Sequence, residues 1–286
     1  MKPPQFDYRR PTSLAEALQL LQEPGAVVLA GGQSLLLELA YREVRPSALV
    51  DINSVPGLDS VTVEDGALRI GALVRHRKFE RPVPVPAMSG AEPLLELLAS
   101  AAPYVAHPPI RSRGTFCGSV AWGHPASEWN AVLAGLRATV HLNSVAGPRQ
   151  LGAAEWFVGD RRTARLPGEL VTAVSLPCPE ATCPATNSAT GFAEHRRTAA
   201  SFAFVAVAVA LSAVDATLTQ ARIGLAGTAN TPVAAAEYEQ ALVGTPVGEA
   251  AAVTRGVRPN TGESYRDAVT AELVSRAVAQ AEGKLR

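Results

Sequence analysis

The chain has 286 residues, 47% of them hydrophobic and 18% charged, and its 26 basic residues balance 26 acidic ones. This length allows one large domain or two ordinary ones with a sizeable buried core. The balanced charge excludes both the basic footprint of a nucleic-acid-binding protein and the acidic tail of a solvating one. The amino terminus, MKPPQFDYRRPTS, has no apolar core, so we expect no secretory signal and a cytoplasmic protein.

The sequence gives little support for a metal site or for a membrane-spanning helix. The cysteines, Cys117, Cys178 and Cys183, are too few for a disulfide framework or for an iron–sulfur cluster held by four thiolates. No two histidines have the i, i+4 spacing of a helical metal site, so we predict no metal site built by this chain alone. The most apolar stretch, AASFAFVAVAVALSAV, is shorter than the about 20 residues of a spanning helix, and its alternation predicts a buried strand.

The first third of the chain alternates helices and strands. Its predicted elements are, in order, a helix at 14–21 with Ser13 as its cap, a strand at 27–29, a helix at 34–41 and a strand at about 49–52. In VTVEDGALRIGAL, two alternating runs flank Asp65-Gly66, which predicts a β-hairpin. EPLLELLASAA then predicts another helix that ends near Pro103.

The middle of the chain is predicted to contain a glycine-bearing loop, a helix and a hairpin. The loop carries Gly114 and Gly118 and leads to Pro125, which we place in the first turn of the helix. Trp129, Val132, Leu133 and Leu136 recur at helical spacing, so this helix should bury one face. ATVHLNSVAGPRQL follows as a hairpin.

A domain boundary is expected in the proline-rich link from Leu176 to Ala189. Beyond it, SFAFVAVAVAL and ATLTQARIGLAGT predict two or three long strands. Two helices follow, at about 234–243 and 264–282. This half should therefore form an antiparallel sheet covered by helices.

The stretch VVLAGGQSLLLELA places Gly31-Gly32 between a predicted strand and a predicted helix. A helix amino terminus offers unpaired N–H groups and partial positive charge, and glycine lets an anion approach the backbone. Ser34 can add a hydroxyl donor. The segment is neither G-x-G-x-x-G nor a P-loop with its lysine, so a purely structural turn is the alternative interpretation.

A second loop of the same kind, RGTFCGS, carries Gly114, Thr115, Gly118 and Ser119. Two such loops in one α/β region could hold the two ends of a diphosphate, or a diphosphate and a ring system. The sequence therefore predicts a dinucleotide site, against the alternative of two tight turns.

Several segments of the chain occur in an order that is informative. They are FDYRRPTSLAEALQLL, VLAGGQSLL, LVDINSVPGL, IGALVRH, IRSRGTFCGSVAWGHPASEW, GELVTAVSLP, FAFVAVAVAL and SYRDAVTAELVSRAVAQA. Together they resemble one family, the FAD-binding medium subunits of molybdenum hydroxylases such as xanthine dehydrogenase and carbon monoxide dehydrogenase. The resemblance covers essentially the whole chain and implies an α+β protein. It implies a two-part FAD-binding domain at 1–177 (subdomains about 1–55 and 56–177), a linker at 178–189 and an α+β carboxy-terminal domain at 190–286.

The resemblance also implies the residues that bind FAD. The first loop, which holds the diphosphate, comprises Leu29, Ala30, Gly31, Gly32, Gln33, Ser34 and Leu35. The second loop, beside the diphosphate and ring, comprises Gly114, Thr115, Phe116, Cys117, Gly118 and Ser119, with His124 shortly after it. Glu128 takes the place of an acidic residue that meets the adenosine part, Leu170 and Val171 match a strand with backbone contacts, and Ala106 and His107 match the loop before the second motif.

Three positions depart from the family pattern. Cys117 replaces a glycine, so its φ must suit a side chain or the loop must shift. His124 replaces an aspartate, and Ser201, in Ala200-Ser201-Phe202, stands where relatives carry the aspartate of Gly-Asp-Phe/Tyr. No Ser/His/Asp set or close carboxylate pair stands out, so we nominate no catalytic side chain and interpret His107 and His124 as incidental loop histidines.

The resemblance implies an electron-transfer flavoprotein subunit. Its partners would be a [2Fe–2S] subunit, which supplies electrons, and a molybdopterin large subunit, in a heterotrimer that can dimerise. The flavin would pass electrons to NAD+, oxygen or a quinone. The departures at Cys117, His124 and Ser201 motivate an alternative, a self-standing FAD-dependent oxidase or dehydrogenase without these partners. A third hypothesis is a scaffold with an empty flavin cleft.

Overall fold

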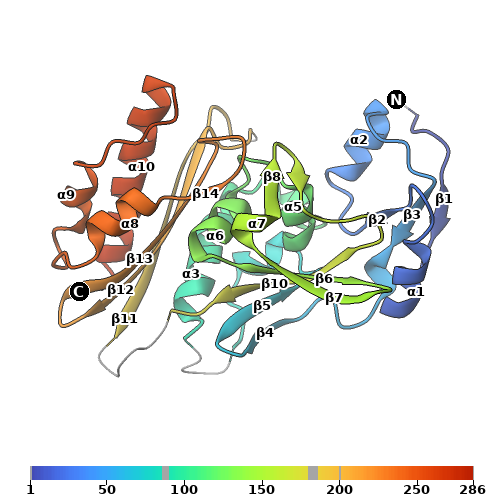
Figure 1. Cartoon of the computed structure of the whole chain (residues 1–286), viewed down its shortest axis with the longest axis horizontal. Coiled ribbons are helices and arrows are strands. Elements are labelled where there is room, and N and C mark those ends of the chain that lie inside the picture. The colour runs from blue at the N-terminus through green and yellow to red at the C-terminus, as the bar shows by residue number, and fades with distance from the viewer. Residues whose placement is uncertain (1, 86–89, 180–185, 200, 286) are drawn as a thin grey trace.

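The computed structural model describes residues 2–85, 90–179, 186–199 and 201–285. Along its long axis lie a small parallel sheet, a five-stranded antiparallel sheet and a four-stranded sheet backed by helices (Figure 1). Within the described ranges, no helix has the length and apolar content needed to cross a membrane. The α+β architecture expected from the sequence is confirmed.

The amino-terminal unit is a three-stranded parallel sheet in the order β1-β3-β2. Its strands are β1 (Asp7–Arg9), β2 (Val27–Leu29) and β3 (Ala48–Asp51), joined by helices α1 (Leu14–Leu20) and α2 (Leu35–Tyr41). The hydroxyl of Ser13 accepts from the backbone N–H of Glu16, so the predicted cap of α1 is confirmed. The 3-10 turn η1 (Ile52–Ser54) follows β3 and leads into the second unit.

The central unit is an antiparallel sheet in the order β4-β5-β10-β6-β7. Its strands are β4 (Val61–Glu64), β5 (Ala67–Gly71), β6 (Thr139–Ser144), β7 (Gly147–Gly152) and β10 (Leu170–Pro177). Both predicted hairpins are present, and the first turns at Asp65 and Gly66 with φ of 49° and 71°. Positive φ at both central residues matches the twist of the flanking strands, which explains the Asp-Gly pair.

Helices cover the central sheet. They are α3 (Glu92–Ala101), α4 (Pro108–Arg111), α5 (Phe116–Trp122), α6 (Glu128–Leu136) and α7 (Ala153–Trp156), with the 3-10 turns η2 (His76–Glu80) and η3 (Ala102–Tyr104) and the small hairpin β8 (Phe157–Gly159) and β9 (Arg162–Thr163). Two sequence-based expectations need correction here. Helix α5 was expected as loop, and α6 begins at Glu128 with Ser127 as N-cap, so Pro125 lies before its first turn.

The carboxy-terminal unit is an antiparallel sheet in the order β11-β12-β13-β14. Its elements are β11 (Asn187–His195), β12 (Val205–Val214), β13 (Thr217–Ala226), β14 (Val233–Ala234), α8 (Ala236–Leu242), α9 (Ala250–Thr254) and α10 (Ser264–Glu282). The predicted helix-covered sheet is confirmed, although the strand β11 was not among the expected elements. Residues 180–185, in the expected linker, lie outside the described residues.

The alternation of β12 explains how this sheet joins the rest of the molecule. Val205, Val207 and Val209 pack into a core with α10, whereas the alanines between them belong to the core of the central unit. The small alanine side chains on this face of the carboxy-terminal sheet let α6 approach the sheet closely. A Cβ on Gly224 of β13 would lie 2.7 Å from the Cα of Gly135 in α6, so the two backbones are in direct contact. Consequently α6 is buried along its whole length instead of on one face only.

Candidate functional site

The structure brings the two predicted glycine loops into contact. A Cβ on Gly31 would lie 2.6 Å from the Cα of Gly114 and would also collide with the carbonyl oxygen of Arg113. A Cβ on Gly114 would lie 2.7 Å from the imidazole of His76. Neither position has room for a side chain, so glycine at both is what allows the loops to meet.

The first loop leaves a run of backbone donors unused. Among the described residues, the backbone N–H groups of 31–35 have no acceptor, and the hydroxyl of Ser34 makes no capping hydrogen bond. Gly32 has a φ of 72°, which turns the chain from β2 into α2. Successive free N–H groups at the start of a helix present partial positive charge, an arrangement that binds phosphate.

Most N–H groups of the second loop have acceptors within the protein, so few are left for the second end of a diphosphate, which is one of the two arrangements expected from the sequence. Phe116 donates its N–H to Val74 O at 2.9 Å, and Gly118 donates its N–H to the Thr115 hydroxyl at 3.0 Å. The physical reason is that residues 116–122 form a helix capped by Thr115. This loop therefore forms a rigid wall against the first loop, which carries the free donors.

Cys117 is accommodated without a loop shift. It lies in the first turn of α5, outside the residues with positive φ, and its side chain is buried. The thiol donates to Ile70 O at 3.4 Å, and burial raises the pKa of Cys117 to about 12. The side chain therefore points into the central sheet, away from the first loop, and stays protonated.

Two residues that the sequence did not single out brace the loops from behind. Asn53 donates its side-chain N–H to Ala30 O in the first loop at 2.8 Å. Arg75 donates to the Asn53 side-chain oxygen at 2.5 Å and also to Arg113 O beside the second loop. Both residues lie in segments that carry the family resemblance, but the sequence does not show their role, because the backbone carbonyls that they reach are brought near only by the fold.

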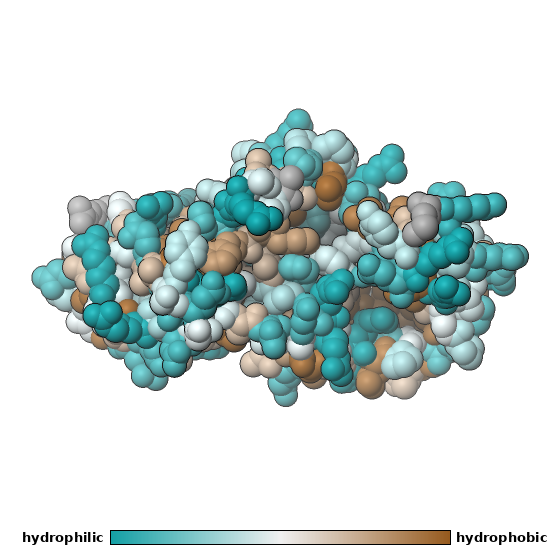
Figure 2. All heavy atoms as spheres, turned by 90° about the horizontal axis from the view of Figure 1, so that it is seen from above, coloured by the Kyte–Doolittle hydropathy of each residue, from teal (hydrophilic) through white to brown (hydrophobic). Residues whose placement is uncertain are grey.

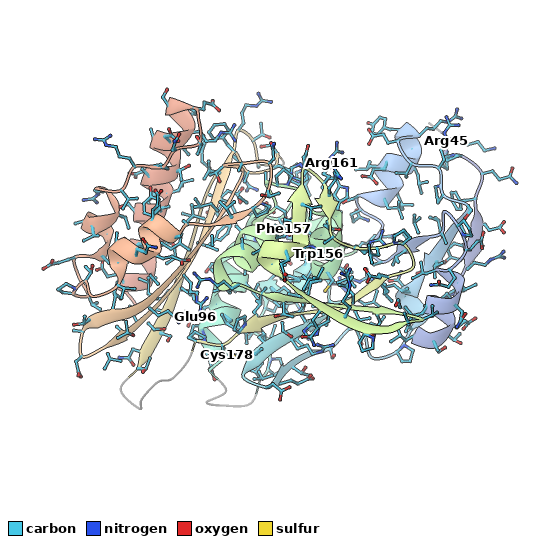
Figure 3. The ribbon with its side chains drawn as sticks, viewed as in Figure 1. Arg45, Glu96, Trp156, Phe157, Arg161 and Cys178 are labelled. Atoms are coloured by element: carbon cyan, nitrogen blue, oxygen red, sulfur yellow. The ribbon has the colours of Figure 1, made fainter. Side chains whose placement is uncertain are left out.

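Trp122 and Trp156 fix helix α5 from two sides. The indole of Trp122 donates to Glu38 of α2 at 2.7 Å, which links the helices that follow the two loops. The indole of Trp156 donates to Val120 O at 3.0 Å, and Figure 3 shows this side chain in the interior of the molecule. Helix α5 is thus held both to the amino-terminal unit and to α7.

His76 is a buried structural residue. Trp129 donates its indole N–H to the Nδ1 atom of His76 at 2.9 Å, and the rings stack at 6.0 Å. Burial, with the charges of Arg111 and Arg75, lowers the pKa of His76 to about 3, so the imidazole is neutral. It fills the space beside Gly114 and offers no acid–base function near pH 7.

His124 belongs to an aromatic stack that spans the two halves of the chain. Its ring lies 5.1 Å from that of Trp122 and 3.8 Å from that of Phe202. Burial lowers the pKa of His124, and its Nδ1 atom accepts from Ala126 N–H at 3.2 Å. Ser201 directly precedes Phe202, the carboxy-terminal member of this stack. Ala200 lies outside the described residues. Figure 2 shows the molecule from above, with apolar side chains gathered near its middle.

Glu128 lies next to the second loop. The hydroxyls of Ser127 and Ser119 are 2.9 Å apart, which places the first turn of α6 against α5. The Glu128 residue is only 5% exposed, and burial raises its pKa to about 7. A carboxyl at this position thus titrates near neutral pH, unlike a solvated glutamate.

The four remaining candidate residues lie outside the two loops, in neighbouring elements. Ala106 has a φ of 45° and accepts from Arg111 at its carbonyl, and His107 caps α4. Leu170 and Val171 are buried at the start of β10, which packs beneath α5. A cavity of about 830 Å³ is lined by residues that include Asn53 and Arg75 and by none of the predicted site residues.

Comparison with known proteins identifies the family. Residues 4–179 match the family described as the FAD binding domain in molybdopterin dehydrogenase. The chain belongs to this family. Residues 190–281 match the CO dehydrogenase flavoprotein C-terminal domain. FAD as the cofactor, expected from the resemblance, is therefore confirmed for this family member.

Relatives cover the chain from end to end. It is 35% identical to the 6-hydroxypseudooxynicotine dehydrogenase complex subunit alpha of Paenarthrobacter nicotinovorans, over 98% of this chain and 96% of that protein. It is 31% identical to the carbon monoxide dehydrogenase medium chain of Afipia carboxidovorans, with 99% of each covered. The structure of quinoline 2-oxidoreductase from Pseudomonas putida 86 matches with a TM-score of 0.85 at 31% identity over 100% of both chains. The family is thus one of oxidoreductase subunits.

The residues present fit a flavin dinucleotide. The free N–H groups of 31–35 suit its diphosphate, and Gly31 and Gly114 give the close backbone approach that this requires. Within the described part of the chain, no three His, Cys, Asp or Glu residues gather as a metal site.

Proposed function

We propose that this chain is the FAD-binding electron-transfer subunit of a cytoplasmic molybdenum-containing hydroxylase or dehydrogenase complex. Electrons would arrive from the [2Fe–2S] clusters of a partner subunit, which receives them from a molybdopterin large subunit. An external acceptor, NAD+, oxygen or a quinone, would take them from the flavin. The complex would be a heterotrimer that can dimerise.

One observation carries this proposal: the unpaired N–H run at 31–35, pressed against the second glycine loop in a chain of this family. An unpaired run of backbone donors is costly unless a ligand or water completes it. The relatives named above are described as a complex subunit and a medium chain, which supports a partnered role for this chain.

The residues of this chain would hold and orient the cofactor. FAD, when bound, supplies an isoalloxazine that exchanges electrons singly or in pairs. Loop 29–35 would bind the diphosphate, while the wall formed by Thr115 to Ser119 would fix its position. The brace of Asn53 and Arg75 keeps both loops in register, because it hydrogen-bonds to a carbonyl at each.

Purification with the chains encoded beside it tests the proposal. We expect two further chains to copurify, and an absorption spectrum that combines a flavin band near 450 nm with iron–sulfur absorption. Reduction by an organic substrate of the complex should bleach the flavin band only when the iron–sulfur chain is present.

A different result would support the self-standing flavoenzyme instead. In that case the protein purifies alone as a yellow monomer or homodimer, and a small-molecule donor reduces its flavin without any iron–sulfur protein. Purified protein that takes up no FAD would contradict both functions.

A further inference from the structure

The cavity whose lining includes Asn53 and Arg75 lies between two segments of the chain. Its walls come from residues 53–59, which follow β3, and from residues 73–82, which follow β5. Leu73 donates its backbone N–H to Leu58 O at 2.7 Å, so the two segments are joined directly. The volume of about 830 Å³ falls in the range of small-molecule sites, which is about 300–1,000 Å³. The cavity therefore has the size of a ligand site and firmly connected walls.

Positive charge predominates on the lining of this cavity. The lining carries two carboxylates, Asp59 and Glu80, and four cationic side chains, which are Arg75, Arg77, Lys78 and Arg81. Glu80 is already engaged, since it accepts from Arg111 at 2.5 Å. Among the residues that the structure describes, none of the four cations forms an ion pair. Like charges gathered at one concave surface attract an anion that offsets their repulsion.

Arg75 is the cation that the fold holds in place before a ligand binds. Its guanidinium donates to Asn53 Oδ1 at 2.5 Å and to Arg113 O. The other N–H groups of this guanidinium have no acceptor among the described residues, and a planar guanidinium matches the oxygens of a phosphate. Burial, with the charges of Arg77 and Arg113, lowers the pKa of Arg75, so the neighbouring cations add to the positive charge around it. Arg75 is thus a fixed anion-binding group in the wall of the cavity.

The rest of the lining is suited to an organic group. Val55, Leu73 and Val74 are buried apolar residues of the lining, so they offer a surface on which a ring can pack. The exposed carboxylate of Asp59 suits a hydroxyl, because an ionised carboxylate only accepts hydrogen bonds. Cations, apolar surface and one acceptor together fit a phosphate ester of a hydroxylated organic group, which uses more of the lining than a bare inorganic ion does.

We propose that this cavity binds an organic polyphosphate of nucleotide size, with Arg75, Arg77 and Lys78 on its phosphate groups. The site goes beyond the proposed function, because none of the candidate FAD residues lines the cavity. An acidic protein segment would meet the same cations, but a concave site with buried apolar side chains in its lining favours a small molecule.

Calorimetric titration of the FAD-loaded full chain with UDP, and separately with inorganic pyrophosphate, tests this site. Bound FAD keeps its own phosphate loop occupied, so binding of either probe reports on another site. We expect one UDP per chain, with an affinity that falls about threefold or more between roughly 50 and 200 mM salt, since exposed charges are screened. Pyrophosphate should bind about threefold or more weakly than UDP, because it has no organic group to pack on the apolar side chains.

Two substitutions test the cations. Arg77 and Lys78 are exposed and form no ion pair within the described part of the chain, so the fold should persist without their charges. Arg77→Gln and Lys78→Gln should each weaken UDP binding about 10- to 100-fold, the range for loss of a charged hydrogen bond, while the flavin absorbance stays unchanged. Arg255→Gln, at another exposed arginine that follows α9, is the matched control and should leave UDP binding unchanged.

Three results would overturn the inference. They are the absence of binding by both probes, UDP affinity no higher than that of pyrophosphate, and equal UDP binding by the wild type and the double variant Arg77→Gln/Lys78→Gln. UDP that binds only deflavinated protein and is displaced by FAD would assign the cations to FAD and would overturn it as well. Wild-type protein that takes up no FAD would contradict the proposed function alone, since UDP titration of the FAD-free chain still tests this cavity.

Discussion

At Gly31 and Gly114 a single hydrogen in place of a side chain determines whether two distant segments can touch. The two loops meet through their backbones, since the nearest atoms to a Cβ on Gly31 would be main-chain atoms of Arg113 and Gly114. Main-chain atoms cannot rotate away as a flexible side chain can. A methyl group at this point must therefore displace a loop.

Gly31→Ala should abolish flavin binding while the fold persists. The new methyl group would separate the loops and misplace the N–H groups of 31–35, so we expect at least a fivefold lower ratio of absorbance at 450 nm to that at 280 nm. Gly152→Ala is the control, because its Cβ would have no neighbour closer than 3.6 Å. Normal flavin content in the Gly31 variant would show that the contact is not required.

Glu194→Gln should change how stability depends on pH. The pKa of Glu194 is raised from 4.5 to about 8, so between these values the unfolded chain loses a proton that the folded chain keeps. Wild-type stability contributed by this group therefore falls as pH rises through that window. The melting temperature of the deflavinated variant minus that of the wild type should increase by about 3–6 °C from pH 5 to pH 8.5. A difference that stays constant with pH would contradict the shifted pKa.

At the scale of elements, helix α6 links the candidate site residue Glu128 to the contact between the central and carboxy-terminal units. Its first residue is Glu128, its middle contacts β13, and its last turn precedes Arg137, which pairs with Glu239 of α8 at 2.5 Å. Ala131 and Gly135 lie one turn apart on the face that meets Gly224. The position of Glu128 therefore depends on a close helix–strand contact far from the loops.

Gly135→Ala should destabilise the protein. The Cβ would lie 2.5 Å from the backbone nitrogen of Gly224, so α6 must move away from β13. Overpacking of this kind costs about 1–3 kcal/mol, which lowers the melting temperature by roughly 3–8 °C. Differential scanning calorimetry measures the shift, with Gly152→Ala again as the reference. Flavin content should fall less than in Gly31→Ala, because the glycine loops themselves are untouched.

Periodicity and turn chemistry predicted most elements because those signals are local. Ser13 caps its helix and Asp65-Gly66 turns its hairpin through neighbouring residues alone. The burial of α6 on all sides could not be predicted, since it depends on β13 about 90 residues later. The same holds for the brace of Asn53 and Arg75, whose hydrogen bonds reach backbone carbonyls that are distant in sequence.

At the scale of the whole molecule, the two halves share one core. The alanines of β12 pack with side chains of the central sheet, and Thr190 of β11 donates to Pro93 O at the start of α3. Lys284, near the carboxyl terminus, reaches Glu96 of the same helix. The contacts between the halves are thus distributed along α3 and α6, so neither half is complete alone.

Residues 1–179 expressed alone should be less stable than the full chain and should expose the apolar face of α6. We expect increased fluorescence of a hydrophobic dye, elution as aggregates in size-exclusion chromatography and weak FAD binding. Addition of a 187–286 fragment during refolding should restore flavin binding. A monomeric 1–179 fragment that binds FAD as tightly as the full chain would contradict the shared core.

The burial of α6 between the two halves has a consequence for biosynthesis. A ribosome releases the glycine loops long before it releases β13, whose last residue is Ala226. Until then the helix that begins with Glu128 lacks its close backbone contact with β13. The FAD site therefore cannot be completed before β13 has been translated. We expect FAD to be loaded only after translation of the subunit is nearly finished.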